Sequence, residues 1–74
     1  MIKRGDIVKR KDGLQISPYL PNGGMTAKVV IGQGETLGEF AWHYNDYKPL
    51  PIDKIGIHIG LFPTFENADE YEKV

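Results

Sequence analysis

The sequence predicts a mainly β fold: a small closed β-structure with at most one short helix. Nine glycines and five prolines are spread so widely through the 74 residues that only two stretches of ten or more, 39–48 and 64–74, lack both. Isolated helices need roughly 10 or more residues with few Gly or Pro, so the rest of the chain must form short strands and turns. Strict apolar alternation over residues 55–61 adds a direct strand signal.

Length and composition indicate a single domain, residues 1–74, in the cytoplasm. A chain this short buries only about 60% of its unfolded surface, so its core is expected to be thin. The absence of cysteine excludes a disulfide framework and a thiol nucleophile, and it favours a reducing compartment. The first residues lack the apolar run of a signal peptide, and no segment reaches the ~20 apolar residues of a membrane span. We therefore expect a soluble protein with no membrane partner.

Two strands are expected in the first 33 residues. Residues 5–13 contain the apolar pair Ile7 and Val8 and end in Asp12-Gly13, a turn signal because glycine accepts positive φ. The prolines and glycines of residues 18–24 then indicate a loop of about ten residues. Residues 25–33 predict the second strand, with Ala27, Val29 and Ile31 on one face and Thr26, Lys28 and Val30 on the other.

The pattern of residues 36–47 fits either a helix or a strand. In a helix, Thr36 would be the N-cap, Glu39 its capping-box partner, and the apolar stripe would contain Leu37, Phe40, Ala41 and Tyr44. In a strand, Phe40, Trp42 and Tyr44 would share one face. Both interpretations stay open.

The last third of the chain gives the strongest strand signal. Ile55, Ile57, Ile59 and Leu61 alternate with Gly56, His58 and Gly60. Glycines on one face of a strand indicate a bend or bulge of a curled sheet, and they also permit close approach of a partner to His58. Residues 66–74 are expected to form either one or two helical turns or a final edge strand.

Charges are segregated along the chain, although the net charge is only -1. Residues 1–11 contain Lys3, Arg4, Lys9, Arg10 and Lys11 against Asp6, and residues 66–74 contain Glu66, Asp69, Glu70 and Glu72 against Lys73. We expect the two ends to lie side by side and neutralise each other, because small nucleic-acid-binding domains are usually strongly basic overall. The alternative is a nucleic-acid-binding module in which the five basic residues contact phosphates.

Several short segments resemble SH3-like barrels, in particular short bacterial proteins of the YodC-like kind. They are residues 5–13, with a GDxVxxxxG-type start, then Gly24-Met25-Thr26, Trp42 and residues 51–55. The resemblance implies a barrel of about five strands and names no ligand. SH3-like barrels commonly bind along a groove lined by aromatic rings.

Residues 34–45 resemble the start of a LysM module, whose G[DE]TLxxIAxxY[GN] segment forms a strand end and a first helix. That resemblance implies binding of N-acetylglucosamine polymers. A LysM module needs a second helix directly afterwards, where this chain has Pro49, Pro51 and the isoleucine alternation. The SH3-like barrel is therefore the fold that we expect.

The residues favour a binding module over an enzyme, with no cofactor and no metal. His43, Asp46 and His58 are the only candidates for a metal or acid–base site, and zinc sites need three or four convergent ligands. Aromatic side chains suit interfaces because they bury much apolar area with few rotamers. The expected protein-binding residues are Tyr19, Trp42, Tyr44, Tyr47 and His58. The sequence thus predicts a non-enzymatic protein-interaction module, an accessory or inhibitory protein of bacterial or phage origin.

Overall fold

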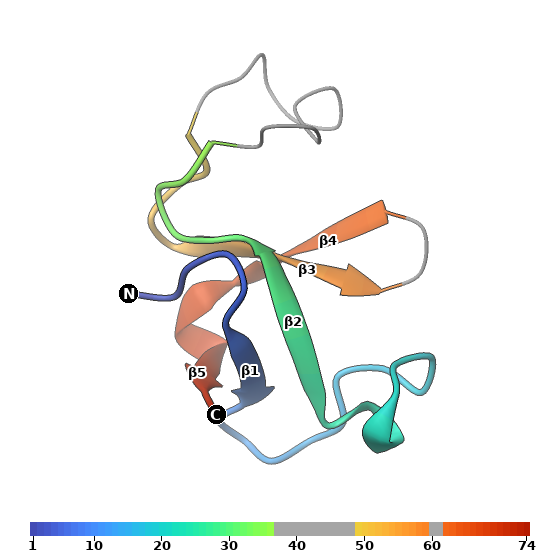
Figure 1. Ribbon diagram of the computed structural model, residues 1–74. Helices are drawn as coiled ribbons and strands as arrows, with labels where there is room; N and C mark the ends of the chain where they lie inside the picture. Colours follow the sequence, from blue (N-terminus) through green and yellow to red (C-terminus); the bar gives the residue numbers. More distant parts are fainter. Residues whose placement is uncertain (37–48, 60–61) are drawn as a thin grey trace.

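Five antiparallel strands form one sheet in the computed structural model, which describes residues 1–36, 49–59 and 62–74. The strands are β1 (Ile7–Arg10), β2 (Thr26–Ile31), β3 (Lys54–Ile59), β4 (Phe62–Asn67) and β5 (Tyr71–Lys73). Two 3-10 turns, η1 (Asn22–Gly24) and η4 (Ala68–Glu70), are the helical elements of the described residues. The sheet order is β4-β3-β2-β1-β5 (Figure 1). The prediction of a small, mainly β fold of about five strands is confirmed.

The sheet is curled but not closed, so the expected closed barrel is wrong in this respect. Among the described residues β4 pairs with β3 and β5 pairs with β1, and no ladder joins β4 to β5. Yet these two edge strands are consecutive in the chain and are joined by the three residues of η4 alone. A 3-10 turn rises about 2 Å per residue, so the two edges must lie near each other. Figure 1 shows η4 leading from β4 directly to the side of β1.

The last nine residues combine the two structures that the sequence left open. η4 supplies a single 3-10 turn, and β5 then forms an edge strand whose Glu72 lies opposite Lys9 in β1. The first and last strands are therefore neighbours, as the charge pattern predicted.

The main core lies on the concave face of the curled sheet. It contains Ile2, Val8, Ala27, Val29, Ile55, Ile57, Ala68 and Tyr71. Val8, Val29, Ile55 and Ile57 are completely inaccessible to solvent, as the alternation in each strand predicts. Full burial of one such side chain contributes roughly 1.5–3 kcal/mol, so these few residues carry much of the stability of a thin core.

A β-bulge in β2 moves Ile31 out of that core. Val29 lies opposite Ile57, whereas Ile31 lies opposite Gly56, so two residues of β2 advance against one of β3. Because side chains alternate between faces, Ile31 then lies on the Gly56 side of the sheet. There it forms a second cluster with Leu50, against which Val30 and Phe65 pack. Ile31 is buried as predicted, but the prediction that it shares a face with Ala27 and Val29 is wrong.

Gly56 makes room for this second cluster. A Cβ atom at position 56 would lie 3.2 Å from both Cβ and Cδ1 of Ile31. Phe65 lies opposite Gly56 on the other side, in β4. Gly56 therefore marks a bulge of the curled sheet, as the sequence analysis predicted for glycines on one face of this strand. The other glycine of the alternation, Gly60, lies outside the described residues.

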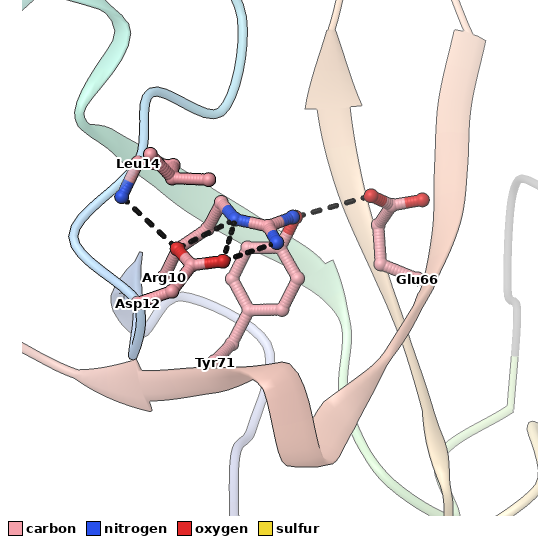
Figure 2. A network of polar contacts seen from close by, with 5 residues as sticks. All are labelled: Arg10, Asp12, Leu14, Glu66 and Tyr71. Atoms are coloured by element: carbon pink, nitrogen blue, oxygen red, sulfur yellow. Dashed lines mark hydrogen bonds and ion pairs between the residues drawn. The ribbon is translucent and has the colours of Figure 1, made fainter.

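Side chains connect the two edges of the sheet where no ladder does. The Tyr71 hydroxyl of β5 donates to Glu66 Oε1 of β4 at 3.1 Å, and the Arg10 guanidinium lies 5.9 Å from the centre of the Tyr71 ring (Figure 2). Arg10 in turn makes an ion pair of 2.6 Å with Asp12. Burial, followed by the Glu66 charge, raises the pKa of Tyr71 to about 12, so its hydroxyl keeps the proton that it donates.

The contact between Ile31 and Gly56 predicts that substitutions at these positions are coupled. Ile31→Val should lower the free energy of unfolding by about 1 kcal/mol, and Gly56→Ala should lower it by about 1–3 kcal/mol through overpacking. The double variant should lose less than the sum of the two, because the shorter valine side chain lacks the Cδ1 atom that the new methyl group would meet. Urea denaturation measures all three values. The control is Val8→Ala, which changes a fully buried residue of the other cluster in β1, two strands away from Gly56; its effect should add to that of Gly56→Ala.

The hydroxyl of Tyr71 predicts a second stability effect. Tyr71→Phe removes the hydrogen bond to Glu66 and should lower the free energy of unfolding by about 1 kcal/mol. Tyr19→Phe removes the same atom from a ring that is 86% exposed, and it should leave thermal and urea denaturation unchanged. Equal effects of the two substitutions would show that the bond between the edges contributes nothing.

Candidate functional site

The connection between β1 and β2 is held in one conformation by its own hydrogen bonds. The amide of Ile16 donates to the carbonyl of Gly24 at 2.8 Å, and that of Leu20 donates to the carbonyl of Ser17 at 3.3 Å. Gly24 has a φ of +76°, and a Cβ there would lie 1.9 Å from the Ser17 carbonyl oxygen. Only glycine fits this crossing of two backbone segments.

This loop places an aromatic ring in solvent and a side chain against the core. The Tyr19 amide donates to the buried Ser17 side chain at 3.2 Å, and the Tyr19 ring itself is 86% exposed. The next residue, Leu20, is half-buried and packs against the main core together with Ile16. The loop is thus anchored on both sides of Tyr19.

A groove of about 340 Å³ lies between this loop and the outer face of the sheet. Its described lining consists of Ile7, Leu20, Pro21, Thr26, Ala27, Lys28, Val30 and His58. The sheet register explains why residues so far apart in sequence meet there. Ile7 lies opposite Lys28, and the pairing of Val29 with Ile57 places His58 beside Lys28 on the next strand. The floor is therefore a row across β1, β2 and β3.

The groove combines an apolar wall with the side chains of one lysine and one histidine. Ile7 is 43% exposed, and Leu20 and Val30 are half-buried. Lys28 and His58 are both exposed, and neither side chain makes a hydrogen bond or an ion pair with another described residue. The site can thus bury apolar groups and still offer N–H donors to an acceptor.

The structure brings together part of the predicted protein-binding set. His58 lines the groove, whereas Tyr19 directly precedes the lining residue Leu20 in the chain and is not itself part of the described lining. Trp42, Tyr44 and Tyr47 lie outside the described residues, as do His43 and Asp46. Sequence reasoning missed Ile7, Lys28 and Leu20, although the alternation of the second strand had already placed Lys28 on the outward face.

The basic residues near the N-terminus are largely engaged within the chain. Lys9 pairs with Glu72 at 3.8 Å, and Lys73 pairs with Asp6 at 3.4 Å. These two pairs join β1 or the residue before it to β5, so the prediction that the charged ends lie side by side is confirmed. Of the five basic residues near the N-terminus, Lys9 is the one with a described ion pair to an acid of the C-terminal segment. Arg10 pairs with Asp12, whereas Lys3 and Lys11 are exposed. Exposed pairs of this kind are screened by water and add little to stability.

The Arg4 side chain donates hydrogen bonds to two backbone carbonyls. Its Nε donates to the carbonyl of Val30 at 2.9 Å and its Nη2 to that of Thr36 at 3.2 Å. The Glu35 carboxylate accepts the amides of Arg4 and Gly32. A second hollow of about 310 Å³ is lined by Arg4, Glu35 and Thr36. The two charged side chains of its described lining, Arg4 and Glu35, already bind backbone groups, so these residues have a structural role.

Comparisons with protein-family models, with curated proteins and with solved structures yield no match. Within the described part of the chain, no group of three or more His, Cys, Asp or Glu side chains is placed to hold a metal ion. Across the same residues, no helix has the length and apolarity required to cross a membrane. The groove beside Tyr19 therefore has to be interpreted from its own geometry.

The Arg10–Asp12 pair predicts a measurable shift in acid titration. The hydrogen bond from Arg10, followed by that from the Leu14 amide, lowers the pKa of Asp12 from its ordinary value of 3.8 to about 2. The folded-state pKa is depressed, so the stabilisation is present above pH 3.8 and is lost as the pH falls through about 2. Arg10→Ala should raise the Asp12 pKa toward 3.8, as measured by NMR titration of its carboxyl carbon. Lys9→Ala should leave it unchanged; equal shifts in both variants would contradict the assignment.

Proposed function

We propose that this protein is a non-enzymatic protein-binding module that docks its partner in the groove beside Tyr19. The observation that carries the proposal is an aromatic ring that is 86% exposed on a hydrogen-bonded loop whose next two residues, Leu20 and Pro21, line an apolar groove. A lone exposed apolar residue needs no explanation. Tyr19 supports the proposal because its loop also supplies Leu20 and Pro21 to the groove.

The order of the loop supports this assignment energetically. Binding costs roughly 0.5–1.5 kcal/mol for each side chain that must be immobilised, and a preordered loop has already lost most of that freedom. Tyrosine buries a large area with only two rotatable bonds and is enriched among residues that dominate interface energies. Tyr19 is therefore the residue whose truncation should weaken binding most.

The chemistry of the groove supports binding over catalysis. Among the described lining residues, His58 is the one histidine, and it is the group best suited to acid–base catalysis. A catalytic imidazole is normally oriented by a second group, whereas the His58 side chain has no hydrogen bond to any described residue. Its exposed position is suited to contact with a partner.

The fold proposed for the module is an SH3-like one. The sheet order β4-β3-β2-β1-β5 and the 3-10 turn between the last two strands support it, since such barrels pair the first strand with the last. Together with the YodC-like segments, this favours a small bacterial or phage accessory or inhibitory protein. The resemblance adds nothing about the ligand, which depends on the groove.

The test is a pull-down from the source cell with three tagged forms of the protein. The wild type and Leu14→Ala should capture the same partner. Tyr19→Ala should bind that partner with at least about tenfold lower affinity, which corresponds to about 1.4 kcal/mol of binding free energy. Leu14 is a matched control because it is 63% exposed on the same loop and does not line the groove. Thermal denaturation checks that all three forms fold. Equal capture by all three forms would overturn the proposed site.

A further inference from the structure

We propose that the groove takes an extended peptide segment in which an acidic side chain is flanked by apolar ones, with its carboxylate bound between Lys28 and His58. This inference rests on the proposed function and specifies the partner's chemistry. It follows from three features of the groove: the sign of its charge, the nature of its walls and its width.

The charge of the groove is positive in a chain whose net charge is -1. Lys28 and His58 are adjacent on the outer face, and the described lining contains no carboxylate. Four acids on neighbouring elements already have partners outside the groove. Asp6 accepts a hydrogen bond from the Lys3 amide and makes an ion pair with Lys73. Asp12 pairs with Arg10, Glu72 pairs with Lys9, and Glu66 accepts a hydrogen bond from the Tyr71 hydroxyl. Asp53 precedes the first residue of β3, about 17 Å along the strand from His58 at 3.3 Å per residue. Within the described residues, the groove therefore lacks the anion that its two nitrogen groups would bind.

The walls of the groove select what surrounds that anion. Ile7, Leu20, Pro21 and Val30 form its apolar surface. An ionised group that enters such surroundings must be hydrogen-bonded and charge-paired to offset its lost hydration. Lys28 and His58 supply both for one carboxylate, while the apolar wall favours aliphatic or aromatic neighbours.

The width of the groove suits a short stretch of extended chain. The row from Ile7 through Lys28 to His58 crosses three strands, which at about 4.8 Å between strands spans roughly 10 Å. An extended peptide covers that distance in about three residues. A nucleic-acid strand would need a longer track of cations, and the described lining offers one lysine, Lys28, and one histidine, His58, among eight residues.

The inference is tested by selecting phage-displayed random octapeptides on the immobilised protein. Enriched sequences should carry Asp or Glu with apolar neighbours. The affinity of a synthetic peptide of the enriched sequence should fall about tenfold or more in Lys28→Glu and less in Lys28→Ala, as expected for loss of a charge contact. Lys11→Glu makes the same change of charge at an exposed position outside the groove, and it should leave the affinity within about twofold.

The outcomes separate this inference from the proposed function. Enriched peptides that lack acidic residues but lose binding in Tyr19→Ala would overturn the acidic preference and keep the groove as the binding site. Peptides unaffected by both Tyr19→Ala and Lys28→Glu would overturn both. Single-stranded DNA that binds at about 50 mM salt and loses affinity in Lys28→Glu, in competition with the peptide, would assign the groove to nucleic acid instead.

Discussion

The structure depends on one constraint, the three-residue connection between strands at opposite edges of the sheet. β4 and β5 are consecutive in the chain, yet three other strands lie between them in the sheet order. Because η4 spans only about 6 Å at 2 Å per residue, the sheet has to curl until its edges approach. The curl encloses the apolar residues of β1, β2 and β3 on one face, and it leaves the Tyr71 hydroxyl and the Glu66 carboxylate close enough to bond across the gap.

The same curl explains the second cluster and the groove. A strongly curved sheet needs a local change of register, and the bulge in β2 provides it where Gly56 leaves space for Ile31. Beyond the bulge, the outer face carries Ile31 and Phe65 against Leu50. Val30 lies at the boundary, because it packs against this cluster and also lines the groove. Before it, the outer face carries Lys28 and its neighbours, which stay open. One face of the sheet is therefore divided into a packed half and a half that a partner can reach.

Local and tertiary forces act together in the loop that carries Tyr19. Its backbone bonds are local, within residues 16–24, but Leu20 reaches the core and fixes the loop against the sheet. An exposed aromatic residue on such a support is oriented before it meets a partner, so less entropy is lost on binding. The function proposed for the protein thus follows from how the loop is anchored more than from the presence of a tyrosine.

The sequence by itself determined the mainly β class, the presence of strands within residues 5–13, 25–33 and 55–61, most of the buried alternation within them and the proximity of the oppositely charged ends. These follow from local preferences and period-two patterns, which act over a few residues. Only the tertiary structure decided that Ile31 changes face, that the sheet stays open, and that Ile7, Lys28 and His58 form one row. The bulge and the groove depend on register between strands whose paired residues are about 17 to 28 positions apart in the chain. The glycine pattern indicated that a bulge would occur, but the residue that changes face depends on how the two strands pair.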